Sequence, residues 1–158
     1  MSSTKFHPLE ELAIIIAGEK RQGKTIALAN GGFDLIHVGH IRYLQEASQL
    51  ADRLVVALNS DRSLRGLKGD NRALIDQEGR VRLLSALQCV DYVTLFDESR
   101  VDRVLLSLKP DFHCKGSDYT VESVPERDTV LSYGGNIAIV GGDKVRSTSE
   151  IIQYILHL

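Results

Sequence analysis

The stretch "TIALANGGFDLIHVGHIRYLQEASQLADRLVVALN" (residues 25–59) determines the expected fold of this chain. An apolar run at 25–30 ends at two glycines, and a second apolar run occupies 53–59. Between them, apolar residues recur at helical spacing: Ile41, Leu44, Ala47 and Leu50. A strand, a helix and a second strand in this order predict a βαβ unit, whose parallel strands are joined by a right-handed crossover.

The same alternation continues to the end of the chain. A short helix is expected after Pro8, before the first strand. We expect further helices at 77–87, 99–108 and 147–157, and further strands at 92–96, 112–116 and 136–140. The pattern predicts an α/β fold, a three-layer sandwich with a Rossmann-like, five-stranded, mostly parallel sheet and helices on both faces. Ligands of such sheets bind at the carboxyl ends of the strands.

The composition is that of an ordinary soluble domain. The chain has 158 residues, and its formal net charge of -2 gives no overall field that would attract nucleic acid or an anionic membrane, so neither is expected as a partner. The apolar run at 12–17 is far shorter than the ~20 residues that cross a bilayer, and no secretory signal begins the sequence. Cys89 and Cys114 lie among apolar residues, so we expect buried, reduced thiols and a cytoplasmic protein.

Two phosphate-binding patterns follow one another near the N-terminus. The first, Gly18 to Thr25, reads G-x-x-x-x-G-K-T, the pattern of a P-loop. A P-loop follows a strand and opens a helix, whereas here a helical pattern precedes it and two glycines soon follow. The sequence instead favours a helix C-terminus with Gly23 in the left-handed conformation. A P-loop phosphotransferase built on Lys24 is the weaker hypothesis.

The second pattern lies in the strand–turn–helix frame that a phosphate site needs. Asn30 ends the strand, and Gly31 and Gly32 let the backbone approach a bulky anion closely. His37 and His40 are three residues apart, so both rings can face a ligand at the positive end of the helix. Two imidazoles at that end suit a polyphosphate whose charge rises during reaction. A shared metal ion or ordinary packing are the alternatives, and no third metal ligand lies nearby in sequence.

The strand–turn–helix segment and several later motifs resemble a known family. Residues 30–61 strongly resemble the nucleotidylyltransferase superfamily with the His-x-Gly-His motif. "LKGDNRA" (67–73), "KGSDY" (115–119) and "RSTSEII" (146–152) resemble in particular the adenylyltransferases that act on D-glycero-β-D-manno-heptose 1-phosphate, in ADP-heptose synthesis for lipopolysaccharide. The resemblance implies one nucleotidylyltransferase domain over 1–158, with a helix and connection at 1–24 and a catalytic core at 25–158. The chain is similar to the stand-alone form of these enzymes, which has no sugar kinase domain.

The activity that the resemblance implies is transfer of a nucleotidyl group to a sugar 1-phosphate. ATP would supply an adenylyl group, Mg²⁺ would accompany the triphosphate, and pyrophosphate would leave. The resemblance also implies a homodimer. Two alternatives stay open: a cytidylyltransferase that acts on glycerol 3-phosphate or a related phosphorylated alcohol, and a non-catalytic nucleotide-binding module of the same fold.

The resemblance also implies roles for individual residues. His37 and His40 would be catalytic and would hold the α- and β-phosphates. The nucleotide would contact Asn30, Gly31, Gly32, Phe33, Gly39, Lys68, Arg80, Ser147 and Thr148. The acceptor would contact Asp34, Arg72, Lys115, Gly116, Asp118 and Tyr119. Structural alternatives are a solvated loop for Lys68 and Arg72, a surface position for Arg80, and a capping box of Ser147 with Glu150.

The chain departs from the family pattern at several positions. Ala29 stands where the family usually has threonine, and Gly32 where it has valine, cysteine or threonine. Ser117 replaces a glycine, and Gly142 with Asp143 replaces the Arg-Thr pair of the cytidylyltransferases. We expect the changes at Ala29 and Gly32 to alter the contacts around the phosphates.

Overall fold

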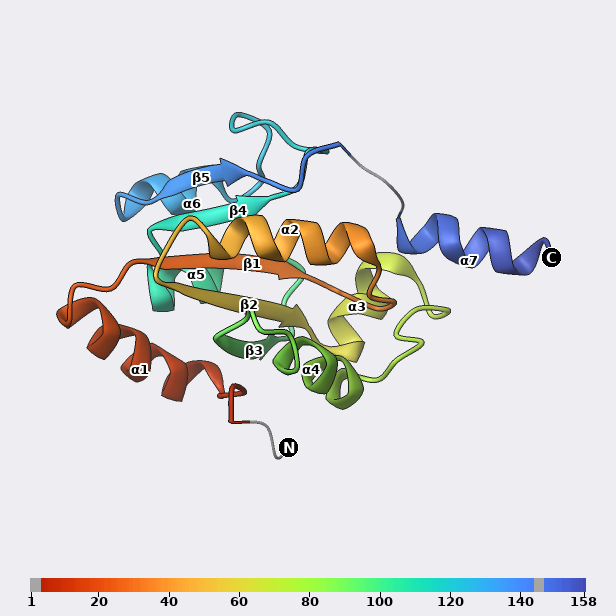
Figure 1. The fold of residues 1–158 in the computed structure, drawn as a ribbon, viewed down its shortest axis with the longest axis horizontal. Helices are drawn as coiled ribbons and strands as arrows, with labels where there is room; N and C mark the ends of the chain where they lie inside the picture. Colours follow the sequence, from red (N-terminus) through yellow and green to blue (C-terminus); the bar gives the residue numbers. More distant parts are fainter. Residues whose placement is uncertain (1–3, 144–146) are drawn as a thin grey trace.

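The computed structural model describes residues 4–143 and 147–158, and its centre is a five-stranded sheet (Figure 1). The strands are β1 (Ile26–Gly31), β2 (Arg53–Asn59), β3 (Tyr92–Phe96), β4 (Phe112–Lys115) and β5 (Asn136–Ile139). The helices are α1 (Leu9–Arg21), α2 (Val38–Ser48), α3 (Asp61–Lys68), α4 (Gln77–Ser85), α5 (Asp102–Leu108), α6 (Arg127–Ser132) and α7 (Thr148–Leu156). The order β3-β2-β1-β4-β5, with every pair parallel, confirms the expected Rossmann-like sandwich.

Alternate residues of the central strands pack on opposite faces of the sheet. Ala27 and Ala29 of β1 lie in one buried cluster with apolar residues of α2 and α4. Ile26 and Leu28 lie in the other, with apolar residues of α1, α5 and α6. The strands are therefore buried on both faces, as in other parallel sheets, and their carboxyl ends are left to form a site.

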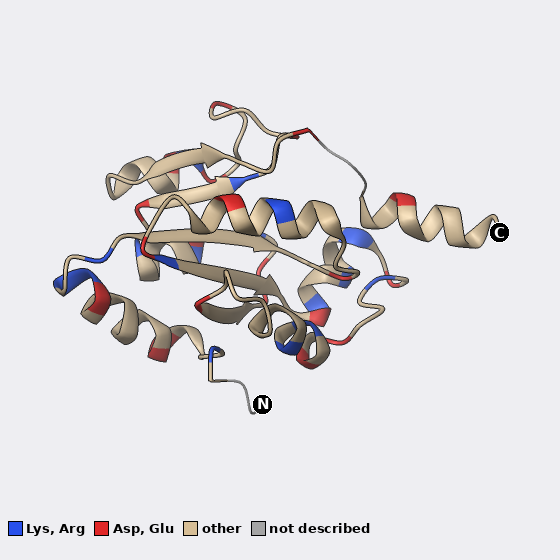
Figure 2. Ribbon diagram, viewed as in Figure 1, with Lys and Arg blue, Asp and Glu red and all other residues tan. Residues whose placement is uncertain are grey.

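The amino-terminal edge of the sheet is capped by aspartates. Asp52, Asp91 and Asp111 each come directly before a strand, β2, β3 and β4 respectively. Their carboxylates accept hydrogen bonds from the amides of Thr25 (2.9 Å), Leu54 (2.8 Å) and Ile26 (2.8 Å). In Figure 2 acidic residues mark the starts of β2 and β4, and a basic residue marks the end of β4. At the amino-terminal edge of the sheet, carboxylates thus occupy backbone amides that an anionic ligand would need.

The P-loop pattern falls at this amino-terminal edge, where aspartates accept from the backbone amides. Helix α1 ends at Arg21, and Gly23 has a φ of +81°, so the prediction of a helix C-terminus is confirmed. The hydroxyl of Thr25 donates to Asp52 at 3.0 Å, and a phosphate there would meet that carboxylate. Lys24 and Thr25 therefore lie at the wrong end of β1 for a nucleotide site.

Two short helices were not predicted from the sequence. Lys68, expected in a loop, is the last residue of α3, which Ser60 caps by accepting from the amide of Ser63 at 3.2 Å. Helix α3 spans eight residues and buries only Ser63 and Leu64, so its face toward the core is short. Helix α6 spans only six residues. Within the described ranges, every helix is too short or too polar to cross a membrane.

Candidate functional site

The turn between β1 and α2 lies at the carboxyl edge of the sheet and has an unusual backbone conformation. Phe33 has a φ of +47°, a conformation that non-glycine residues rarely adopt. Its buried ring lies 3.1 Å from the position that a Cβ at Gly31 would occupy, which explains the glycine there. The same ring packs against His40, with 5.1 Å between centroids. Phe33 thus packs against the His40 ring and helps to hold it in place.

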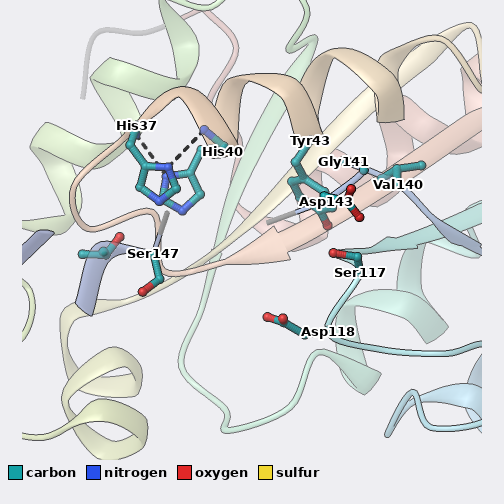
Figure 3. Close-up of a pocket in the computed structure, with 13 residues that line it drawn as sticks. His37, His40, Tyr43, Ser117, Asp118, Val140, Gly141, Asp143 and Ser147 are labelled. Carbon is teal, nitrogen blue, oxygen red and sulfur yellow. Dashed lines mark hydrogen bonds between the residues drawn. The ribbon is translucent and has the colours of Figure 1, made fainter. Parts of the chain in front are cut away.

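His37 and His40 form a stacked pair at the start of α2 (Figure 3). The ring centroids are 3.9 Å apart and the planes differ by 28°. Nδ1 of His37 accepts from the amide of Gly39 at 3.1 Å, and Nδ1 of His40 accepts from the amide of His37 at 3.3 Å. Because each Nδ1 is an acceptor, a neutral ring carries its proton on Nε2. The pair both caps the helix and offers Nε2–H donors.

Burial keeps the second histidine uncharged. Loss of solvent and, to a smaller extent, the neighbouring His37 together lower the pKa of His40 to about 4. His40 is therefore a neutral hydrogen-bond donor near pH 7. The positive end of α2 adds a favourable field for an anion without adding a mobile charge.

A first cavity of about 260 Å³ opens beside the histidine pair. It is lined by His37, Gly39, His40, Tyr43, Gly116, Ser117, Asp118, Val140, Gly141, Gly142, Asp143, Ser147 and Thr148. These residues come from the starts of α2 and α7 and the ends of β4 and β5 (Figure 3). Gly141 and Gly142 have φ values of +96° and +60°, which glycine adopts without strain. The cavity combines two helix starts with the imidazole donors, which suits a polyphosphate.

A second cavity of about 460 Å³ lies on the other side of the end of β1. Its lining includes Asn30, Gly31, Gly32, Asn59, Leu64, Lys68, Ser99, Arg100, Lys115, Tyr119 and Glu126. Tyr43 and Gly116 line both cavities, so the two adjoin. The Tyr43 hydroxyl donates to the carbonyl of Cys114 at 2.7 Å, which fixes the ring at their junction. Lys68, Arg100 and Lys115 contribute three cationic side chains to the second cavity, which favours an anionic ligand there.

A buried histidine orients the amide at the end of β1. His113 is fully buried, and its Nε2 lies 3.0 Å from Oδ1 of Asn30. Burial lowers the pKa of His113 to about 3, so the ring is neutral and can donate to that oxygen. The Asn30 side chain is thereby held at the wall of the second cavity.

The alternative that Arg80 is a surface residue is wrong. Its side chain is fully buried. Its guanidinium donates to the carbonyls of Gly32 (2.7 Å), Asn59 (2.8 Å) and Ile75 (3.0 Å), and to the carboxylate of Asp61 (2.7 Å). Arg80 therefore holds the β1–α2 turn from behind, through protein contacts. Its contact with a nucleotide stays a prediction.

Asp34 and Arg72, expected to bind the acceptor, contact each other. Nε of Arg72 lies 3.2 Å from Oδ2 of buried Asp34, and the amide of Ile75 donates to Oδ1 at 3.2 Å. Arg72 also approaches the hydroxyl of Ser149 in α7, at 3.4 Å. This pair ties the 69–76 segment to the β1–α2 turn and to α7. Acceptor binding by either residue stays a prediction.

The structure divides the remaining expected residues between the two cavities. Gly39, Asp118, Ser147 and Thr148 join the histidines in the first, although Asp118 was expected at the acceptor. Asn30, Gly31, Gly32, Lys68, Lys115 and Tyr119 line the second, although four of these were expected at the nucleotide. Gly116 lines both. Ser147 also forms the expected capping box with Glu150. Arg146 of the "RSTSEII" segment lies outside the described residues.

Sequence reasoning missed two charged residues of the second cavity, Arg100 and Glu126. Both lie in irregular segments outside the quoted motifs, and neither carries a spacing signal. The departure at Gly32 is explained by Leu64, whose Cδ1 would lie 2.7 Å from a Cβ at that position. Leu64 of α3 thus takes space that a larger residue at 32 would need. Ala29 lies fully buried in the core.

Comparison with known proteins settles the family. A family model described as cytidylyltransferase-like matches residues 28–156. The chain belongs to this family of nucleotidylyltransferases. The expected superfamily and the expectation of a nucleotidyltransferase enzyme are therefore confirmed at the level of the family.

Relatives extend the likeness over nearly the whole chain. "Bifunctional protein HldE" of Geobacter metallireducens is 50% identical over 99% of this chain, and that of Geobacter sulfurreducens is 49% identical over 96%. The chain spans about a third of their length, 32% and 31% respectively.

Two solved structures share the fold. One, titled a lipopolysaccharide core biosynthesis protein from Thermoplasma volcanium, has a TM-score of 0.63 and 30% identity, over 74% of this chain and 94% of that one. The other, a pantoate-beta-alanine ligase from Francisella tularensis, has the same TM-score with 13% identity, over 91% of this chain and 68% of that one. At that identity the ligase shows the fold alone.

Proposed function

We propose that the chain transfers an adenylyl group from ATP to D-glycero-β-D-manno-heptose 1-phosphate and releases pyrophosphate. The observation that carries this proposal is the stacked His37–His40 pair in one cavity, beside a second cavity lined by cations. The relatives named HldE and the structure titled a lipopolysaccharide core biosynthesis protein support the choice of acceptor. "KGSDY" at 115–119 supports it through the family resemblance.

ATP would occupy the first cavity. Its α- and β-phosphates would accept hydrogen bonds from Nε2 of His37 and His40, and from the backbone at the start of α2. The glycine backbone at 141–142 would line the nucleoside end. Fixed donors aimed at the phosphates stabilise the charge that develops on the bridging oxygen, with little reorganisation.

The acceptor would occupy the second cavity, with its phosphate near Lys68 and Lys115. A phosphate oxygen of the acceptor would attack the α-phosphorus of ATP. A new P–O bond forms, the bond from the α-phosphorus to the bridging α–β oxygen breaks, and pyrophosphate leaves with that bonding pair. The adjoining cavities would hold both reactants in line, so the protein contributes orientation and charge neutralisation rather than a covalent intermediate.

Mg²⁺ would enter with the triphosphate. Among the described residues there is no group of three or more His, Cys, Asp or Glu side chains that could hold a metal ion without the nucleotide. Asp118 and Asp143 line the first cavity and offer the oxygen ligands that Mg²⁺ prefers. The ion would neutralise part of the triphosphate charge.

A pyrophosphate-release screen tests the reaction. ATP, CTP, GTP and UTP are each combined with heptose 1-phosphate and with glycerol 3-phosphate. We expect the highest kcat/KM for ATP with heptose 1-phosphate. Preference for CTP with glycerol 3-phosphate would support the cytidylyltransferase alternative, and binding without turnover of any pair would support the non-catalytic module.

We further propose a homodimer in the cytoplasm, on family resemblance. The free thiols of Cys89 and Cys114 are in keeping with a reducing compartment, although Cys89 is only half-buried. Sedimentation at micromolar concentration tests the oligomeric state, and a monomer there would contradict the dimer.

A further inference from the structure

A buried carboxylate in the second cavity has no role in the reaction as described so far. Glu126 comes directly before α6 and is only 4% exposed. Its Oε2 has no hydrogen-bond partner among the described residues, and Nζ of Lys115 lies 4.0 Å away. A buried carboxylate oxygen without a hydrogen bond is costly, and a donor on a bound ligand would offset that cost.

The neighbours of Glu126 hold this wall of the cavity in place. Arg100 donates to the carbonyl of Pro125 at 2.6 Å and to Asp102 at 2.8 Å. Lys115 lies over the ring of Tyr119, with 4.6 Å between Nζ and the centroid. Burial lowers the pKa of Lys115, while Glu126 acts in the opposite direction. Arg100 thus holds the segment that carries Glu126, and Lys115 is the ion-pair partner of Glu126.

We propose that Glu126 binds hydroxyl groups of the acceptor, so that the second cavity selects a polyhydroxylated sugar phosphate over a simple alkyl phosphate. This inference rests on the proposed function and identifies what its acceptor site recognises. An ionised carboxylate can only accept hydrogen bonds, and it repels phosphate. Lys68, Arg100 and Lys115 provide the charge for the phosphate. Hydroxyl donors are what remains for Glu126 to bind.

The test compares Glu126→Gln with wild type and with Glu122→Gln, a change at an exposed carboxylate of the same segment. Calorimetry measures binding of heptose 1-phosphate and of methyl phosphate, with α,β-methylene-ATP present. We expect wild type and Glu122→Gln to prefer the sugar phosphate roughly 10- to 100-fold, as hydrogen bonds to a charged group imply. In Glu126→Gln that preference should fall to within about threefold, with methyl phosphate bound at least as tightly as before.

Three outcomes would overturn the inference. Wild type could bind the two ligands equally, Glu126→Gln could keep the preference, or it could weaken both ligands alike, as a residue that merely balances Lys115 would. A wild-type protein that binds heptose 1-phosphate selectively and yet releases no pyrophosphate would overturn the proposed reaction instead. Circular dichroism and a melting curve confirm that each variant is folded.

Discussion

The two ends of strand β1 carry similar-looking phosphate patterns in opposite surroundings. Before its first residue lie Gly23, Lys24 and Thr25, and the Thr25 amide and hydroxyl both bind the Asp52 carboxylate. After its last residue the chain turns into α2, whose first turn carries His37 and His40. One end presents carboxylates to the strand amides, and the other presents imidazole donors and a helix start. Glycine and lysine do not make a phosphate site without that helix start.

The largest expected effect lies at the histidine end. His37→Ala or His40→Ala removes a donor that tightens on the phosphates as charge develops. We expect kcat to fall on the order of 10²–10³-fold, roughly 3–4 kcal/mol. Steady-state kinetics with ATP and heptose 1-phosphate measures the loss, and circular dichroism checks the fold, because both rings also cap α2. Near-normal turnover in both variants would remove the catalytic assignment.

The second-largest expected effect concerns Arg80, whose side chain holds the β1–α2 turn. Arg80→Lys keeps a charge but loses the planar fork that reaches the carbonyls of Gly32 and Asn59 together with Asp61. Buried acceptors left unpaired should lower the free energy of unfolding by about 2–3 kcal/mol. Urea unfolding measures this, with Arg82→Lys, at an exposed position of α4, as the matched control. Equal stabilities would show that the buried contacts contribute little.

The carboxyl end of β1 was predicted well from the sequence, because its signals are local. The strand, the glycines and both histidines fall within 25–40, and the expected β1, α2 and β2 are all present. Rejection of the P-loop was correct for the same reason, since the segment after Lys24 had no helical pattern. Local patterning of this strength leaves few topologies open.

The second cavity was harder to predict, because its residues come from separate segments. Arg100 follows β3 and Glu126 precedes α6, and only the fold brings them beside Lys68. The burial of Arg80 was equally hard to predict, because arginine is mostly exposed and three of its four acceptors are backbone carbonyls, which carry no sequence signal. Helix α3 was missed because its face toward the core is short.

Acid should destabilise the sheet through buried His113, whose ring contacts the Asn30 side chain at the end of β1. His113 has a pKa of about 3 when folded against 6.5 as the ordinary value, so between these pH values the unfolded chain binds more protons. Its contribution to stability is full above pH 6.5 and is lost as the pH falls toward 3. The slope is about 1.4 kcal/mol per pH unit for one proton.

His113→Gln isolates this contribution. We expect the fall in stability between pH 6.5 and 4.5 to become shallower by about one proton, measured by urea unfolding at several pH values. His157→Gln, at an exposed residue near the C-terminus, should leave the slope unchanged. An unaltered slope in His113→Gln would mean that the buried ring is not neutral.

The smallest expected effect lies at Lys24, the residue that a P-loop would need most. Lys24 is partly exposed and lies near Glu19 and Asp52, whose pKa values it helps to lower. Its charge near the end of α1 should contribute under ~1 kcal/mol, so Lys24→Ala should change turnover by less than about threefold. Lys68→Ala, the matched lysine at the other edge, should raise the KM for the acceptor about 10-fold, because it removes a charge-assisted contact with phosphate. The same kinetic assay measures both variants. Strongly reduced turnover in Lys24→Ala, with a near-normal KM in Lys68→Ala, would instead place the phosphate site at the amino-terminal end of β1.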